Sequence, residues 1–175
     1  MTDIFLRSVC REDLNSVYRI YSHRQSCLDC GVKPVRTLGQ AQRLLEKITE
    51  NRDTFAIVLK NDLKTAGFIS VSKDIHRYNS RRYMLGYILE PEYRGRGIMP
   101  SAVKKALHHG FLNLGADVVS AACFSHNKAS QRVLEKCGFV CEGCLRKEFA
   151  RYDGRVLDSL MYSILYEEYK ELYEE

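Results

Sequence analysis

The sequence has few of the features that divide a chain into parts. It has only three prolines among 175 residues, no low-complexity tract and no internal repeat, so nothing marks a linker. With 45% hydrophobic and 28% charged residues, we expect one globular domain over residues 1–175. No stretch approaches 18 apolar residues, which argues against a membrane span. Asp3 and Arg7 interrupt the first apolar run, so we expect no signal-peptide core.

The cysteines do not form a clear metal or disulfide pattern. Seven is an odd number, and without a secretory signal it favours reduced thiols and a cytoplasmic location. Cys27 and Cys30, with His23 one helical turn earlier, supply three potential zinc ligands but no evident fourth. Cys141 and Cys144 fall in a predicted strand, where residues three apart point to opposite faces. We therefore predict no metal site, and leave open whether Cys27 and Cys30 have a redox role.

The most informative segment is residues 91–99, which read Pro-Glu-Tyr-Arg-Gly-Arg-Gly-Ile-Met. It follows an apolar strand-like run, 84–89, and precedes residues 98–114, which are apolar at helical spacing. Such a junction favours phosphate binding, because first-turn N–H groups lack helical acceptors and glycines permit positive φ. Pro100 stands where the dinucleotide fingerprint needs a third glycine, and no Gly-Lys-Ser/Thr follows, so neither nucleotide motif is present.

The charge distribution adds little by itself. The net charge of +5 is modest, and no recognisable module or interleaving of aromatic and basic residues indicates nucleic-acid binding. Basic residues near the glycine segment suit a polyanionic ligand, or else form a solvated basic surface. They are Arg77, Arg81, Arg82, Arg94, Arg96, Lys104 and Lys105.

A second motif follows about 30 residues later, over residues 127–139. Taken residue by residue, it is a short helix capped by Asn127, with a buried stripe that includes Ser130, and ended by Gly138. The order of features is more specific: strand, Arg-Gly-x-Gly, long helix, strand, then Asn-x-x-Ser-(x)7-Gly-Phe. In that order the chain resembles the GNAT superfamily of acetyl-CoA-dependent N-acetyltransferases.

A third segment narrows the resemblance. Residues 138–148 contain Gly-Phe-x-x-Glu-Gly-x-Leu-Arg, followed by an Asp-Gly turn and an Asp-x-x-x-Tyr that ends at Tyr162. This pattern is similar to the ribosomal-protein N-terminal (Rim-type) acetyltransferase branch. The implied substrate is the N-terminal α-amine of a ribosomal or other protein. A small-amine enzyme, acting on a polyamine, amino acid or antibiotic, and a non-catalytic acyl-CoA-binding regulator stay open as alternatives.

The expected fold combines local patterns with this resemblance. It is an α/β (α+β) GNAT fold, with a mixed, mostly antiparallel seven-stranded sheet and helices on both faces. The strands 82–89 and 117–124 are expected to splay apart after a bulge. The other predicted strands cover 4–9, 54–60, 65–73, 139–151 and 156–165. Helices are predicted from Arg11, after Thr37, from Ile98, after Asn127 and at the acidic C-terminus, with a loop over 27–36.

The resemblance also implies a cofactor site. Acetyl-CoA is the expected co-substrate, and the backbone N–H of Leu89 would face the thioester oxygen. Acetyl-CoA would contact Leu89, Arg94, Gly95, Arg96, Gly97, Ile98, Met99, Asn127 and Ser130. One departure is Glu92, where the superfamily loop usually has Gln or Arg.

Two side chains carry the implied acid–base roles. Leu134 stands where many family members have a tyrosine acid, so Ser130 inherits protonation of the leaving thiolate. Glu148 matches an acidic residue near the amine and is the expected general base, with His76 and His126 as fallbacks. The expected partners are acetyl-CoA and an amine acceptor, without nucleic acid or membrane, and the chain is expected to be a monomer or homodimer.

Overall fold

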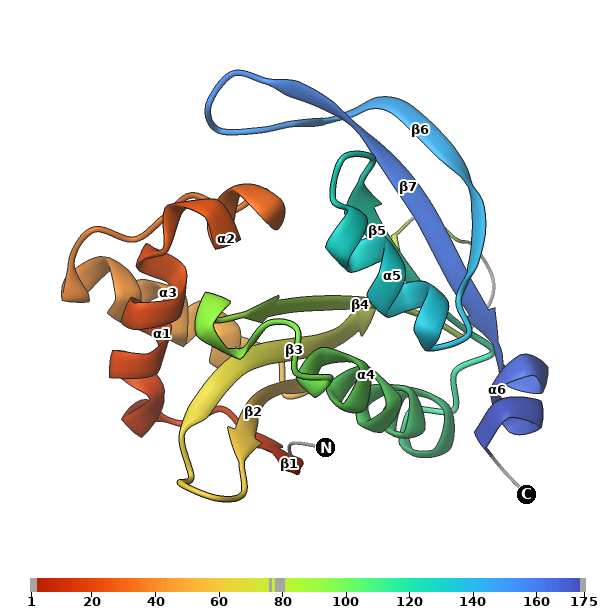
Figure 1. Cartoon of the computed structure of the whole chain (residues 1–175), viewed down its shortest axis with the longest axis horizontal. Helices are drawn as coiled ribbons and strands as arrows, with labels where there is room; N and C mark the ends of the chain where they lie inside the picture. Colours follow the sequence, from red (N-terminus) through yellow and green to blue (C-terminus); the bar gives the residue numbers. More distant parts are fainter. Residues whose placement is uncertain (1–2, 76, 78–80, 174–175) are drawn as a thin grey trace. The chain divides into compact units, whose positions relative to one another are not determined.

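The computed structural model describes residues 3–75, 77 and 81–173, which contain both helices and strands (Figure 1). The elements in order are β1 (Ile4–Ser8), η1 (Arg11–Asp13), α1 (Leu14–Ser22), α2 (Arg24–Asp29), α3 (Leu38–Glu50), β2 (Thr54–Leu59), β3 (Thr65–Lys73), β4 (Arg82–Leu89), η2 (Pro91–Tyr93), α4 (Ile98–His108), η3 (His109–Asn113), β5 (Val118–Phe124), α5 (Lys128–Lys136), β6 (Val140–Ala150), β7 (Val156–Leu165) and α6 (Tyr166–Tyr173).

The strands form one seven-stranded sheet in the order β1-β2-β3-β4-β5-β7-β6. β4 and β5 run parallel, whereas β1/β2, β2/β3, β5/β7 and β6/β7 are antiparallel, which confirms the predicted mixed sheet. The parallel pairing joins Arg82–Leu85 to Val118–Ala121. It therefore stops four residues before β4 ends at Leu89.

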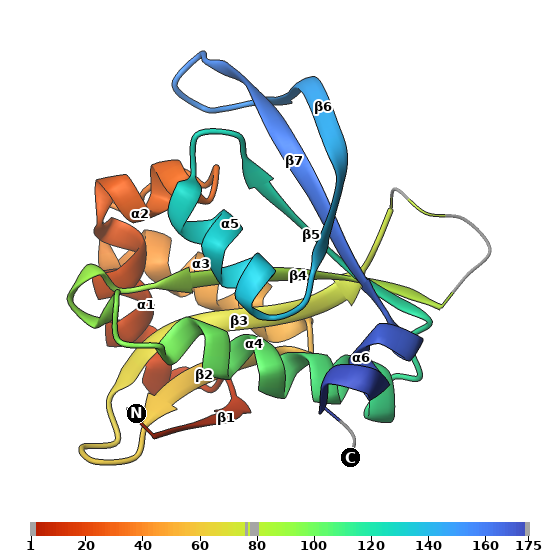
Figure 2. The ribbon, with the colours of Figure 1, turned by 45° about the vertical axis from the view of Figure 1, so that its right-hand side comes forward.

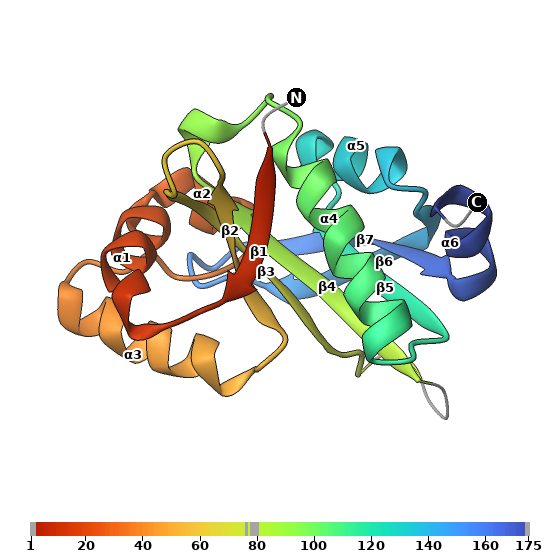
Figure 3. The same ribbon diagram turned by 90° about the horizontal axis from the view of Figure 1, so that it is seen from below.

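Two compact units can be distinguished, and the first comprises Met1–Ser70 and Tyr87–Ala102. In Figure 3, α1 and α3 lie beside one another, with β1 and β2 nearby. Their apolar faces bury the core of this unit against the strands, consistent with the helical spacing of the sequence. The buried core residues are Val17, Ile20, Val35, Ala41, Leu45, Ala56, Val58, Phe68 and Ile88.

The second unit comprises Val71–Gly86 and Val103–Glu175. Its β6–β7 hairpin continues past the end of β5, because β5 pairs with β7 only as far as Phe124 with Ser159 (Figure 2). At the other end, α6 closes over the C-terminus of α5: the Tyr173 hydroxyl donates to Cys137 O at 3.0 Å. The ring centroids of Phe111 in η3 and Tyr169 in α6 lie 4.8 Å apart, so η3 also contacts α6.

Several local predictions need correction. The first helix begins at Leu14, because Arg11–Asp13 form a separate 3₁₀ turn. The predicted loop over 27–36 begins only after α2, which extends to Asp29. The helix from Ile98 is α-helical only to His108 and continues as a π-helical turn, so its period changes before Leu114. No helix in the described part of the chain has the length and apolarity needed to cross a membrane.

Candidate active site

The glycine segment in the first unit has the backbone geometry that the sequence predicts. Gly95 and Gly97 have φ angles of +73° and +75°, and nothing lies within 4 Å of a Cβ built on either residue. Ser101 is the first residue of α4 whose N–H has a backbone acceptor one turn earlier among the described residues. It donates to Gly97 O at 3.2 Å. The preceding N–H groups of Ile98 and Met99 open the helix at the positive end of its dipole. This turn can receive an anion through its backbone.

The two arginine side chains of the segment have protein partners. Arg94 Nη2 donates to Ser26 Oγ at 2.7 Å, and its Nη1 lies 3.4 Å from Asp29 Oδ2. The Arg96 guanidinium lies over the ring of Tyr93, 5.7 Å from its centroid. Arg94 thus joins the glycine segment to α2. An anion bound here would therefore depend mainly on backbone N–H groups, and less on the two arginine side chains than the sequence pattern indicates.

Leu89 is the last residue of β4, and the hydrogen bond of the next residue indicates the direction of the Leu89 N–H. Glu90 N donates to Ala66 O at 2.9 Å, toward β3. Successive amides of an extended strand point to opposite edges, so the Leu89 N–H points to the edge that Arg82–Leu85 use for pairing with β5. The parallel pairing has ended before Leu89, which leaves that edge without its ladder. A strand-end N–H on an edge without ladder partners can donate to a ligand, which is the property expected of Leu89.

Gly67 permits β3 to approach Leu89 closely. A Cβ on Gly67 would lie 3.1 Å from Leu89 Cα and would clash with the Ile88 carbonyl oxygen. β2 and β3 also shift register near this point, between Ile57 and Val58. A glycine inside a strand often indicates such a close approach, but the sequence alone does not identify the partner.

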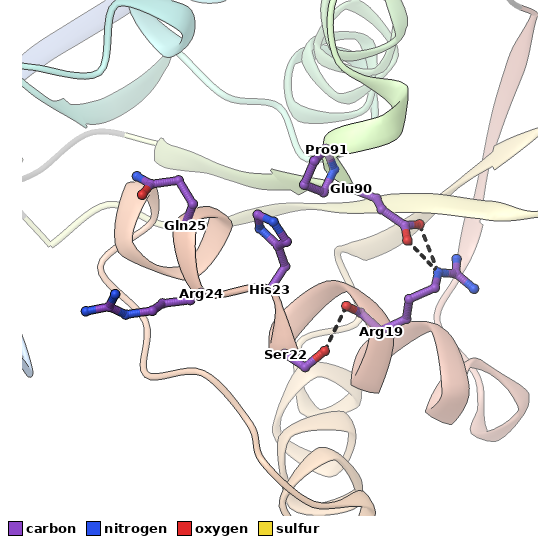
Figure 4. A pocket seen from close by; sticks show the side chains of 7 residues that line it. All are labelled: Arg19, Ser22, His23, Arg24, Gln25, Glu90 and Pro91. Carbon is purple, nitrogen blue, oxygen red and sulfur yellow. Dashed lines mark hydrogen bonds and ion pairs between the residues drawn. The ribbon is translucent and has the colours of Figure 1, made fainter.

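A cavity of about 690 Å³ lies in the first unit, at the two residues that follow β4 (Figure 4). Its lining comes from α1, α2 and the residues that follow β4: Arg19, Ser22, His23, Arg24, Gln25, Glu90 and Pro91. Arg19 Nε lies 2.8 and 2.9 Å from the two carboxylate oxygens of Glu90. Arg19 also donates to Thr65 O at 2.8 Å, which fixes one wall of the cavity.

In the second unit, α5 brings Asn127 and Ser130 together. Asn127 caps the helix as predicted: its Oδ1 accepts from Ser130 N at 3.1 Å. Ser130 is 9% exposed, and its side chain contacts the Cys123 thiol. Burial raises the pKa of Cys123 to about 11, partly offset by the Ser130 hydrogen bond. Leu134, at the position of the family's tyrosine, is fully buried.

Glu148 lies in a distorted part of β6 in the same unit. Its Oε2 accepts from Ser159 Oγ at 2.8 Å. Leu145 pairs with Ser159 and Phe149 with Leu157, so the three residues 146–148 of β6 lie opposite the single residue Asp158 of β7. Lys147 has φ +54° within this bulge. Strict alternation of side chains therefore does not determine which face of the sheet Glu148 occupies.

A bulge also corrects the interpretation of the second cysteine pair. Cys141 pairs with Tyr162 and Cys144 with Leu160, with a register shift between Cys141 and Gly143. Because alternate β7 residues share a face, Cys141 and Cys144 also share one, contrary to the prediction. Within the described residues, no group of three or more His, Cys, Asp or Glu side chains could hold a metal ion.

Several of these features are not evident from the sequence. His76 falls outside the described residues, and His126 stacks on Phe124 with ring centroids 5.7 Å apart. The cavity residues 23–25 lie before the predicted loop over 27–36, and no local pattern in the sequence brings them to Glu90 and Pro91. His23 caps α2 by accepting from Ser26 N, but histidine is not among the residues that usually mark a helix start, so the sequence indicates it only as a potential metal ligand.

Comparisons with known proteins agree on one family. The model described as "Acetyltransferase (GNAT) domain" matches residues 3–140. The "Uncharacterized N-acetyltransferase YoaA" of Bacillus subtilis is 26% identical over 93% of each chain. The spermidine N(1)-acetyltransferase of Escherichia coli is 25% identical, covering 82% of this chain and 76% of its own. The crystal structure of the ribosomal-protein-S5-alanine acetyltransferase from Vibrio fischeri superposes with a TM-score of 0.77, with 25% identity and 94% of each chain covered.

Proposed function

Because the chain belongs to the GNAT acetyltransferase family, which transfers an acetyl group from acetyl-CoA to an amine, we propose that it acetylates the N-terminal α-amine of a ribosomal or other protein. The enzyme is an acyltransferase with acetyl-CoA as co-substrate. We also propose that residues 1–175 act as one catalytic domain. The cytoplasmic location expected from the thiol content stays a prediction.

The observation that carries cofactor binding is the glycine turn before α4. Both glycines have positive φ and open space around them, so a phosphate can approach the backbone without meeting a side chain. We propose that the backbone from Arg94 to Met99 binds the pyrophosphate. Glu92 does not weaken this assignment, because the N–H groups of the turn carry most of the interaction.

The proposed reaction is direct transfer, without an acyl-enzyme. The neutral amine nitrogen attacks the thioester carbon, the C–S bond breaks, and the amine proton leaves as the thiolate departs. The Leu89 N–H stabilises the developing oxyanion, an interaction worth about 3–4 kcal/mol in comparable sites. Asn127 positions α5, Ser130 donates a proton to the thiolate and Glu148 accepts the amine proton, directly or through water.

The acid–base requirement favours an α-amine as acceptor. With a pKa near 7.8, about 14% of an α-amine is neutral at pH 7, against roughly 0.04% for a lysine side chain. A weak or water-relayed base such as an exposed carboxylate is therefore sufficient for an α-amine. This agrees with Glu148, which is exposed and hydrogen-bonded only through one oxygen to Ser159 in the described residues.

A polyamine is the second candidate, because several similar relatives, from Escherichia coli and Vibrio cholerae, are spermidine acetyltransferases. One experiment separates the two. The purified chain is incubated with acetyl-CoA and a set of N-terminal peptides, spermidine, spermine and free amino acids, while released thiol and acetylated product are quantified. We expect peptides to have the highest kcat/KM. Higher kcat/KM for spermidine would replace the proposed substrate, and binding of acetyl-CoA without turnover on any amine would indicate a regulator.

A further inference from the structure

The ring of His23 is held in one tautomer by the start of α2. The Ser26 backbone N–H donates to His23 Nδ1 at 3.2 Å, and an amide N–H can only donate. Nδ1 is therefore the acceptor, and in the neutral ring Nε2 carries the hydrogen. Figure 4 shows the ring extending from the junction of α1 and α2 toward Pro91, so this N–H is available to the cavity.

Arg94 supports the same tautomer. Its Nη2 donates to Ser26 Oγ at 2.7 Å, which occupies a lone pair of that hydroxyl. The Ser26 hydroxyl also lies 3.0 Å from His23 Nδ1, and its hydrogen can be shared with that nitrogen in the tautomer set by the Ser26 N–H. Ser26 is fully buried, which keeps water from competing for these contacts. The glycine segment thus fixes the orientation of a donor in the neighbouring cavity.

The charges around the cavity favour an electron-rich ligand. Its one carboxylate, that of Glu90, already has both oxygens on Arg19. None of the described residues pairs with the Arg24 guanidinium, which lies on the other side of His23 in Figure 4. A protonated polyamine offers only cations and N–H donors, and here it would meet another cation and another donor. A carbonyl or carboxylate oxygen matches both groups.

We propose that this cavity recognises the carbonyl oxygen adjacent to the acceptor α-amine, through His23 Nε2–H, and that Arg24 favours an acidic side chain near the peptide N-terminus. The inference rests on the proposed function, because it assigns the acceptor class for that reaction. Covalent continuity supports it: Leu89, the proposed oxyanion donor, is followed directly by Glu90 and Pro91 of the cavity lining. In a peptide, the amine and the first carbonyl oxygen are likewise separated by only two carbon atoms.

The test of His23 uses a matched pair of substitutions. His23→Asn keeps an acceptor near the Nδ1 position and so keeps the α2 cap, but it cannot reach as far as Nε2. His23→Gln reaches the Nε2 position with an amide N–H but loses the short cap. We expect His23→Asn to raise the peptide KM about 10-fold, with unchanged acetyl-CoA KM and Tm. His23→Gln should have a peptide KM within about 3-fold of wild type and a lower Tm.

A peptide analogue in which the first carbonyl is replaced by CH₂ completes a double cycle. The loss of kcat/KM on changing from the peptide to the analogue should be about 10-fold larger for wild type than for His23→Asn, because the variant has already lost the contact. Comparing the two enzymes on the same two substrates cancels the altered basicity of the amine. Equal losses in wild type and His23→Asn would overturn the contact.

Arg24 is tested with peptides that carry Asp or Lys at the second residue. Wild type should prefer Asp about 5-fold at low salt, Arg24→Gln should lose that preference, and Arg11→Gln, an exposed control in η1, should keep it. If Arg24→Gln keeps the preference, the Arg24 assignment is wrong. If peptides are acetylated normally and His23→Asn has the wild-type KM, the inference fails while the proposed function stands. If only spermidine is acetylated, the proposed function itself fails.

Discussion

Gly67 in β3 lies against the backbone of Leu89 at the end of β4, where a Cβ on Gly67 would come within 3.1 Å of Leu89 Cα. The same Cβ would clash with the Ile88 carbonyl oxygen. A backbone atom cannot rotate away as a side chain can, so any side chain at position 67 must displace the strand that presents the Leu89 N–H. This contact joins a packing requirement to the proposed oxyanion donor.

The first prediction concerns Gly67→Ala. We expect kcat to fall by about 100-fold, because a misplacement of about 1 Å at a reacting centre has effects of that order. The acetyl-CoA KM should change little. Gly39→Ala is the matched control, since nothing lies within 4 Å of its Cβ and alanine favours the helix α3. Steady-state kinetics and Tm check both variants, and a wild-type kcat in folded Gly67→Ala would contradict the role of Leu89.

The second prediction concerns Gly97→Asp. A carboxylate at this turn would repel the pyrophosphate, and we expect the increase in Tm on adding acetyl-CoA to disappear. Gly154→Asp is the control, because Gly154 in the β6–β7 turn also has positive φ, +85°, and no atom within 4 Å of a Cβ. Both variants incur the same backbone strain, but only the first should lose cofactor-dependent stabilisation. An equal Tm increase in wild type and Gly97→Asp would exclude this cofactor site.

The third prediction separates capping from chemistry on α5. Asn127→Ala should lower stability by about 1 kcal/mol and kcat about 10–100-fold, whereas Asn127→Asp keeps the cap to Ser130 N. Ser130→Ala should also reduce kcat about 10–100-fold. Chemical denaturation and steady-state kinetics measure the two effects. Wild-type kcat in folded Ser130→Ala would leave Ser130 as a packing residue beside Cys123.

The fourth prediction concerns Glu148→Gln. If Glu148 accepts the amine proton, turnover should fall at pH 7 and fall less at pH 9, where most of the α-amine is already neutral. Ser159→Ala is a useful comparison, because it removes the hydroxyl that donates to Glu148 but leaves the carboxylate in place. We expect Ser159→Ala to keep a pH profile of wild-type shape. Parallel profiles for wild type and Glu148→Gln would contradict the base assignment.

The fifth prediction concerns stability in acid. Burial alone would raise the pKa of Asp13, but the bidentate contacts from Arg7, each 2.7 Å, and the Cys10 N–H hold it below its usual value. The carboxylate therefore contributes stability that is complete above about pH 3.9 and is lost as pH falls through the lower folded pKa. Asp13→Asn should cost about 2 kcal/mol at pH 7, allowing for the partial exposure of Arg7.

The measurement for Asp13→Asn is urea denaturation from pH 7 to pH 2. The difference in the free energy of unfolding between wild type and variant should shrink below about pH 4, because wild type then loses its own charge. A difference that stays constant over this range would show that Asp13 acts through packing. Glu50→Gln, at an exposed position at the end of α3, is the control and should have little effect.

Local sequence determined the features that depend on a few neighbouring residues. The bounds of β3, β4 and β7 match the prediction residue for residue, because each is a β-favouring run with a clear change in local sequence at its ends. Thr37 and Asn127 cap their helices through side-chain oxygens, as the sequence indicates. These features are local, because a helix cap joins residues two or three positions apart and a positive φ concerns a single residue.

Tertiary structure alone decided the features that depend on distant partners. The bulges of β6 place Cys141 and Cys144 on one face and alter the surroundings of Glu148, because they depend on the register against β7. The Arg94 side chain contacts Ser26, 68 residues away, instead of extending from the glycine turn. No periodicity or turn preference encodes such contacts, because a strand's register and a side chain's partner are fixed only when separate segments pack together.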